Sequence, residues 1–179
     1  MKRKTKVIVG IVLAAALLAG FVMFRKDLSL EKQSSVTEMY GGVDGLMTVT
    51  HPQKVEAYRL KPNLKYDGTE YTDPNDNYEV IAGPALVPET VLAEVSAVLV
   101  SPRSYGWDYA KACMPRYGVR LSFQRGADQV EVYLCFECKI LLVTRNASVT
   151  GGGNFDPMNA TLVRAAQTLF PNDSEIKKL

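Results

Sequence analysis

The chain has 179 residues, of which 47% are hydrophobic and 22% are charged, and its formal net charge is +2. This composition excludes a disordered, a collagen-like or a polytopic membrane protein, and the length allows one ordinary domain. Residues 1–27 hold six of the 21 basic and one of the 19 acidic side chains, which leaves 15 basic and 18 acidic, a net −3, in residues 28–179. We therefore expect no nucleic-acid partner, because proteins that bind nucleic acid carry a basic surface.

An unbroken apolar run near the N-terminus predicts a transmembrane helix. Val7 to Phe24 gives 18 residues without a charge, a proline or a strongly polar side chain. At about 1.5 Å per residue such a helix is roughly 27 Å long, close to the hydrocarbon thickness of a bilayer. Four basic residues precede the run, whereas the three residues after it are nearly balanced in charge. The positive-inside rule then predicts a single-pass protein of the inner (plasma) membrane, with a cytoplasmic N-terminus and residues 28–179 extracytoplasmic.

The alternative to this signal anchor is a cleaved signal peptide, which needs small residues just after the apolar run. The nearest small residues, Ala14 to Ala16 and Ala19-Gly20, lie inside the run, so an anchor that stays uncleaved is the favoured interpretation. Residues 28–54 mix Ser, Thr, Gly, Gln and charges without sustained periodicity. We therefore expect a basic tail and anchor in residues 1–27, a tether in residues 28–54 and an extracytoplasmic domain in residues 55–179.

The first half of the expected domain contains two strands and a helix. Val55 to Leu60 alternates as a strand does, and Tyr78 to Ile81 is a second strand that ends before Gly83-Pro84. From Pro88 the apolar period becomes helical, and Ser101-Pro102 ends the helix. Its apolar face is formed by Val91, Leu92, Val95, Val98 and Leu99.

The clearest element is a β-hairpin with a turn at Arg125 to Asp128. Apolar residues alternate with polar ones on both sides of that turn. One register puts all the apolar side chains on the same face, so the pairing is over-determined. It pairs Val119 with Leu134, Leu121 with Val132 and Phe123 with Val130.

Three further segments complete the predicted fold. Lys139 to Thr144 is a continuously apolar strand and is expected near the centre of the sheet, and Ser148 to Gly153 is expected to be a flexible turn. A last helix begins at Asp156-Pro157 and ends before Pro171. The sequence thus predicts an α+β fold: a small antiparallel sheet with helices packed on one face, after an N-terminal transmembrane helix.

Three cysteines, Cys113, Cys135 and Cys138, fall at one end of this hairpin. Export places them in an oxidising compartment, so we expect a structural disulfide that joins Cys113 to Cys138 or to Cys135 and leaves one thiol over. Such a bond closes a loop of about 25 residues and stabilises the domain by roughly 3 kcal/mol on the loop-entropy model.

Two other interpretations of the cysteines stay open. In the first, the three thiolates bind zinc or another thiophilic metal, although a structural zinc site has four protein ligands and the single histidine, His51, lies in the expected tether. In the second, Cys135 and Cys138 are a redox pair. Redox-active C-x-x-C pairs lie at a helix N-terminus, whereas the residues that follow Cys138 are predicted to form a strand.

The residues around these cysteines carry a resemblance. Cys113-Met-Pro-Arg116, a strand and then Cys135-Phe-Glu-Cys138 resemble an uncharacterised family of bacterial secreted or membrane-anchored proteins. In that family a C-x-P-R-type segment precedes a hydrophobic hairpin and a C-F-E-C motif. The resemblance covers roughly residues 88–179 and implies a small α+β domain in an extracytoplasmic setting. It brings no activity with it.

Catalytic residue sets are sparse. The single histidine argues against a Ser-His-Asp or Cys-His arrangement, and no cofactor motif is recognisable, so an enzyme is not the favoured interpretation. Tyr105, Trp107 and Tyr109 could line a ligand groove, but packing at the sheet edge explains them equally well. We expect a membrane-anchored binding or structural module whose partner is a protein or small ligand. The alternative is a thiol-based metal-binding or redox protein.

Overall fold

The computed structural model of the chain describes residues 22, 25–26, 29–62 and 78–179. The chain divides into two units, residues 1–35 and 36–179, and the second unit contains the sheet. The predicted transmembrane segment, residues 7–24, lies outside the described residues except for Val22. In the part of the chain that is described, no helix has both the length and the apolar character to cross a membrane.

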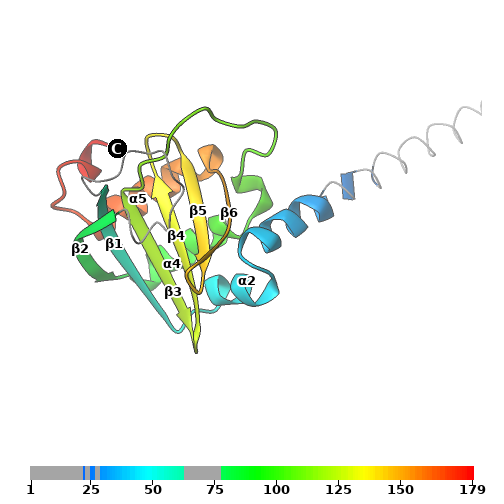
Figure 1. Cartoon of the computed structure of the whole chain (residues 1–179), viewed down its shortest axis with the longest axis horizontal. Helices are drawn as coiled ribbons and strands as arrows, with labels where there is room; N and C mark the ends of the chain where they lie inside the picture. The colour runs from blue at the N-terminus through cyan, green and yellow to red at the C-terminus, as the bar shows by residue number, and fades with distance from the viewer. Residues whose placement is uncertain (1–21, 23–24, 27–28, 63–77) are drawn as a thin grey trace, which may run out of the picture. The chain divides into compact units, whose positions relative to one another are not determined.

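The second unit is a six-stranded antiparallel sheet of order β2-β1-β3-β4-β5-β6 (Figure 1). Helices cover one face of the sheet, as predicted. The strands are β1 (Lys54–Pro62), β2 (Tyr78–Leu86), β3 (Val119–Arg125), β4 (Asp128–Cys135), β5 (Ile140–Arg145) and β6 (Ser148–Asn154). The helices are α2 (Val43–Thr50), α4 (Glu89–Leu99) and α5 (Asn159–Leu169), together with a helical segment over residues 29–39 and short 3-10 turns.

The β3–β4 hairpin has the predicted register. Val119 pairs with Leu134, Leu121 with Val132 and Phe123 with Val130. Their side chains are buried with those of α2, α4 and α5 in the main core. β5 lies between β4 and β6, so it is an interior strand, although it neighbours the edge strand and is not at the predicted central position. Alternation on two neighbouring strands determined this register, because a shift by one residue would place the apolar side chains of one strand beside the polar side chains of the other.

The predicted tether is wrong for its C-terminal part. Residues 36–39 are helical, α2 follows, and Val36, Tyr40 and Val49 are fully buried in the main core. Gly41 and Gly42 join the two helices with positive φ angles of 75° and 95°. Each of the two short helices buries apolar side chains on one side only. The segment is therefore polar in composition, and its helices could not be recognised from the sequence.

The predicted turn at residues 148–153 is also wrong, because these residues form β6. An ideal Cβ on Gly151 would lie 2.9 Å from the Met39 Cα, and one on Gly153 would lie 3.0 Å from the Tyr105 ring. Glycine is therefore required here for close packing, not for flexibility. Because glycine has no side chain, these positions show no alternation of apolar and polar residues. The sequence therefore contains no indication of a strand here.

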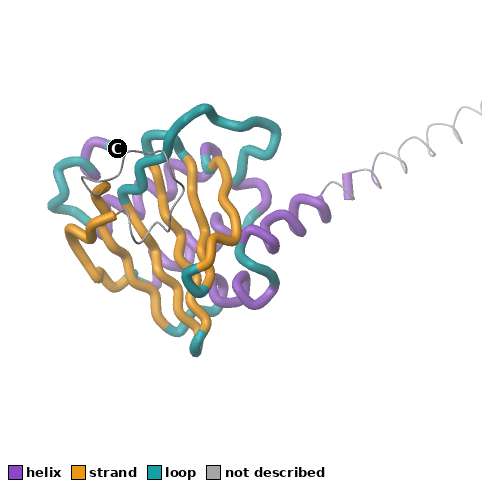
Figure 2. The backbone as a smooth tube through the Cα atoms, in the orientation of Figure 1, coloured by secondary structure: helices purple, strands orange, loops and turns teal. Residues whose placement is uncertain are grey.

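Part of the opposite face of the sheet is buried as well. A second cluster consists of Leu60, Tyr78, Tyr117, Tyr133, Cys135, Cys138 and Leu142. The loop between Ser104 and Val119 crosses the end of the sheet at the β4–β5 turn (Figure 2). That loop brings Tyr117 and Cys113 to the sheet end where the other two cysteines lie.

Candidate functional site

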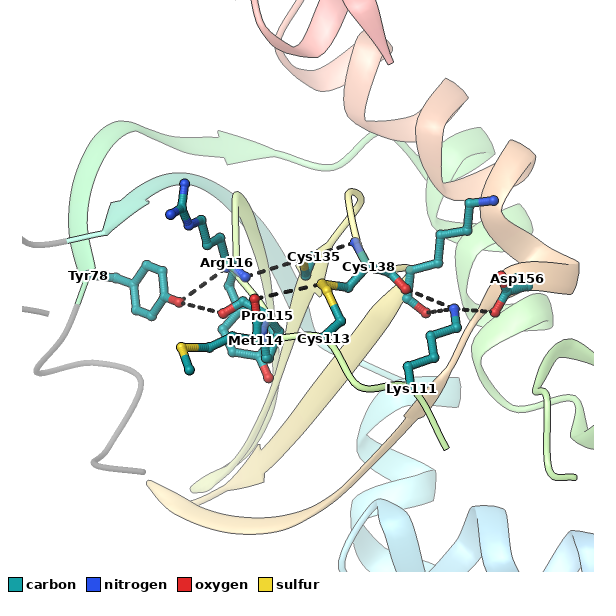
Figure 3. The surroundings of a disulfide bond; sticks show 11 residues. Tyr78, Lys111, Cys113, Met114, Pro115, Arg116, Cys135, Cys138 and Asp156 are labelled. Atoms are coloured by element: carbon teal, nitrogen blue, oxygen red, sulfur yellow. Dashed lines mark hydrogen bonds and ion pairs between the residues drawn. A yellow bond between two sulfur atoms is a disulfide. The ribbon is translucent and has the colours of Figure 1, made fainter. Parts of the chain in front are cut away.

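The three cysteines converge at the β4–β5 turn (Figure 3). Cys113 and Cys138 form a disulfide with a Cα–Cα distance of 6.1 Å, and Cys135 is free and buried. Of the two pairings that the sequence left open, the structure has the one between Cys113 and Cys138. Cys113 itself is exposed, so the bond attaches a surface loop to a buried sheet end.

The sulfur of Cys135 receives two backbone N–H groups. The Arg116 N–H donates to the Sγ at 3.2 Å and the Cys138 N–H donates at 3.4 Å. Figure 3 shows these contacts converging on Cys135 from the loop on one side and from the β4–β5 turn on the other. The free thiol thus contacts both chain segments that the disulfide joins.

The zinc interpretation requires the three sulfurs to be reduced, because two of them are bonded to each other here. Within the described ranges, no three or more His, Cys, Asp or Glu side chains are arranged to hold a metal ion. His51 follows α2 and its Nδ1 lies 2.9 Å from the Thr50 Oγ1. A metal bound to the reduced cysteines stays a prediction.

An ion pair also holds the disulfide loop in place. The Lys111 Nζ donates to the Cys138 carbonyl oxygen at 2.8 Å and to an Asp156 carboxylate oxygen at 2.5 Å. Tyr109 donates to the same carboxylate oxygen at 2.8 Å. Partial burial raises the pKa of Asp156, but hydrogen bonds from Lys111 and Tyr109 outweigh it, so the pKa lies below its ordinary value.

The aromatic group proposed from the sequence is divided between two roles. Tyr105 is buried in the core and donates to the Leu99 carbonyl oxygen, whereas Tyr109 is exposed. The two rings and Trp107 line a pocket of about 550 Å³ next to the glycines of β6. The structure therefore agrees in part with both interpretations: the aromatic group lines a groove, and it also packs at the edge of the sheet.

A larger pocket of about 720 Å³ opens beside the cysteines. The C-F-E-C turn and the C-M-P-R segment both contribute to its wall, through Phe136 and Glu137 and through Arg116. Its full lining is Arg59, Leu60, Lys61, Pro62, Ile81, Arg116, Tyr117, Gly118, Phe136, Glu137, Asp173, Ser174, Glu175, Ile176 and Leu179.

Arg59 supports the floor of this pocket. Its guanidinium is 6% exposed, donates to the Gly118 carbonyl oxygen at 2.7 Å and forms ion pairs with Asp173 and Glu175. Partial burial raises the pKa of Asp173, but it is outweighed by N–H groups of Ile176 and Glu175 and by Arg59, which hold the pKa below its ordinary value. Arg59 and Leu60 point to opposite faces of the sheet and are both buried, because Leu60 packs in the second cluster.

The remaining charges at the pocket are free to meet a ligand. Among the described residues, Lys61, Arg116 and Glu137 form no ion pair. Lys61 and Arg116 are exposed, and Ile81 and Phe136 add apolar surface beside them. The pocket can therefore offer two cations, one carboxylate and an apolar wall to one small molecule.

Sequence reasoning missed this pocket. Arg59 and its partner Asp173 are 114 residues apart, and no local pattern marks either of them. The only signal was a basic residue, Arg59, in phase with Val55 and Ala57, the residues of β1 that face the main core.

Comparison with family models, with curated proteins and with solved structures found no match for the chain.

Proposed function

We propose that the chain is a single-pass membrane protein that presents residues 28–179 outside the cytoplasm as a disulfide-stabilised binding domain. The disulfide between Cys113 and Cys138 carries this proposal, because such bonds persist in oxidising compartments and are rare in the cytosol. The 18-residue apolar run and the four basic residues before it support the same topology.

The pocket beside the disulfide is the proposed ligand site. Arg116 and Lys61 fit an anionic group, and Ile81 and Phe136 fit an apolar portion of the same ligand. Arginine suits a carboxylate or a phosphate, because its planar group donates two parallel hydrogen bonds. We therefore expect a small amphiphilic anion, or a peptide end that presents a carboxylate.

Topology is tested by protease accessibility. The full chain is expressed in a bacterial host, and spheroplasts are treated with a protease that does not cross the membrane. We expect residues 28–179 to be digested while a cytoplasmic control protein stays intact. Protection of the domain in intact spheroplasts, with digestion only after lysis, would contradict the proposed location.

Ligand chemistry is tested by NMR titration of the full chain in detergent micelles. The probes are 4-phenylbutyrate and the uncharged 4-phenylbutanol, at millimolar concentration. We expect amide shifts at Tyr117, Phe136 and Ile176, and about tenfold weaker binding of the alcohol, because a hydrogen bond to a charged group contributes about 1.5 kcal/mol or more. Arg116→Gln removes that difference, whereas Arg103→Gln, at a site outside the pocket, leaves it unchanged. Equal binding of both probes would exclude the anion site.

A second candidate function is thiol chemistry at Cys113, Cys135 and Cys138. One observation favours it: two N–H groups point at the sulfur of the unbonded Cys135. If Cys135→Ser changed neither the metal content of the reduced chain nor its reactivity toward a thiol probe, this candidate would be excluded.

A further inference from the structure

Cys138 has both of the other cysteines close to it. Its present partner is Cys113, at a Cα–Cα distance of 6.1 Å. Cys135 precedes it by three residues across the tight turn that joins β4 to β5. The first and fourth Cα atoms of a tight turn lie within about 7 Å. That separation overlaps the range in which a disulfide forms without backbone movement, about 4.4–6.8 Å.

The sulfur of Cys135 lies next to the existing disulfide. It accepts the N–H of Cys138 at 3.4 Å, so it contacts the main chain of a bonded cysteine directly. The Arg116 N–H approaches the same sulfur at 3.2 Å (Figure 3). A buried thiolate has no water to donate hydrogen bonds to its sulfur. Two backbone N–H donors can take the place of that water. Cys135 is fully buried, so its accessible reaction partner is internal.

We propose that the three cysteines form an intramolecular thiol–disulfide exchange centre. The Cys135 thiolate attacks the Sγ of Cys138, a Cys135–Cys138 bond forms, and the bond between Cys138 and Cys113 breaks. Cys113 leaves as a thiolate and takes up the proton that Cys135 gave up, so the step needs no external oxidant or reductant. This inference deepens the thiol candidate function and does not depend on the ligand pocket.

The exchange moves the free thiol from the interior to the surface. Cys135 is fully buried, whereas Cys113 and its neighbour Met114 are exposed. The released Cys113 thiolate can attack a disulfide of another polypeptide, which frees one partner thiol and joins the two chains. Cys113 is thus the residue at which a partner that carries a disulfide becomes covalently attached.

Digestion with trypsin distinguishes the two disulfide pairings, because Cys113 falls in a different peptide from Cys135 and Cys138. Cleavage after Lys111, Arg116, Arg125 and Lys139 places Cys113 in the peptide Ala112–Arg116 and the other two cysteines in Gly126–Lys139. Before exchange, the two peptides are linked and one cysteine is alkylated. After exchange, Ala112–Arg116 carries an alkylated Cys113 and Gly126–Lys139 carries an internal disulfide.

The experiment incubates the oxidised full chain, in detergent micelles, at neutral and mildly alkaline pH. Samples are then denatured in acid, alkylated with N-ethylmaleimide below neutral pH and digested. We expect alkylated Ala112–Arg116 to accumulate with time, faster at the higher pH because the thiolate is the nucleophile, and at a rate independent of protein concentration. In Cys135→Ser and Cys135→Ala this product is lost and the linked peptide persists.

Two results would overturn the proposal. One is a wild-type chain that yields only the linked peptide at every time and pH. The other is equal alkylation of Cys113 in the wild type and in both Cys135 variants. Persistence of the linked peptide would still leave the proposed disulfide-stabilised domain intact, so the two proposals fail separately.

Discussion

The hydroxyl groups of Tyr40 and Tyr105 lie 3.1 Å apart, and both approach the carbonyl oxygen of Leu99 at the end of α4. This contact joins a segment that the sequence assigned to a tether with an aromatic group for which it left a ligand groove and packing at the sheet edge both open. Both tyrosines are buried in the main core. The N-terminal boundary of the folded domain therefore precedes Tyr40.

Truncation tests this boundary. A chain that begins at residue 29 should unfold cooperatively, whereas one that begins at residue 55 should not fold. The shorter chain lacks Val36, Tyr40 and Val49, which are fully buried, and each such side chain contributes about 1.5–3 kcal/mol. Urea unfolding followed by circular dichroism distinguishes the two chains. A cooperative transition of the shorter chain would contradict the structure described for residues 36–50.

Gly151 should not tolerate a side chain. Gly151→Ala places a Cβ 2.9 Å from the backbone of Met39, and overpacking of this kind costs about 1–3 kcal/mol. The free energy of unfolding should fall by that amount in urea titrations. Val149→Ala on the same strand is the control, since its side chain is half exposed and the change should stay within about 0.5 kcal/mol. A neutral effect of Gly151→Ala would argue that β6 does not lie against residue 39.

The disulfide should contribute measurably to stability. Cys113→Ser should lower the free energy of unfolding by roughly 3 kcal/mol under oxidising conditions, because the loop it closes spans 25 residues. The exposed side chain at position 113 makes few contacts of its own, so wild type and variant should be equally stable once both are reduced. A difference of the same size in the presence of reductant would assign the effect to packing.

The sequence alone predicted most of the sheet and the meeting of the three cysteines, but not the pocket beside them. The β3–β4 register followed from alternation on both strands, and α4 followed from its apolar period. The second buried face could not be predicted, because Tyr133 is covered by residues such as Tyr117 that arrive from a loop. The pocket depends on Arg59 and a segment 114 residues away, a separation at which local patterns carry no information.

Asp128 should make stability depend on pH in the acid range. Partial burial raises its pKa, but hydrogen bonds from Thr48, Arg145 and Asn146 outweigh it, so the folded-state pKa lies below the ordinary 3.8. A lowered pKa means that the folded state favours the carboxylate. Its contribution is therefore complete above the unfolded pKa and is lost as the pH falls through the lower folded value.

Asp128→Asn should then lower the free energy of unfolding by about 1 kcal/mol at neutral pH, and the difference from wild type should shrink below about pH 4. Urea titrations at a series of pH values give both quantities. Asp108→Asn, at an exposed position, is the matched control and should show no pH-dependent difference. A difference that stayed constant down to pH 3 would contradict the assigned role of the charge.

The most direct measurement is the intact mass and thiol count of the full chain recovered from the membrane fraction of the expressing cells. We predict a mass lower by two hydrogens than that of the reduced chain, and a single thiol that reacts with N-ethylmaleimide after denaturation in acid. The chain should take up two further equivalents after reduction. A full reduced mass with three reactive thiols would contradict an extracytoplasmic domain that is held by a disulfide between Cys113 and Cys138.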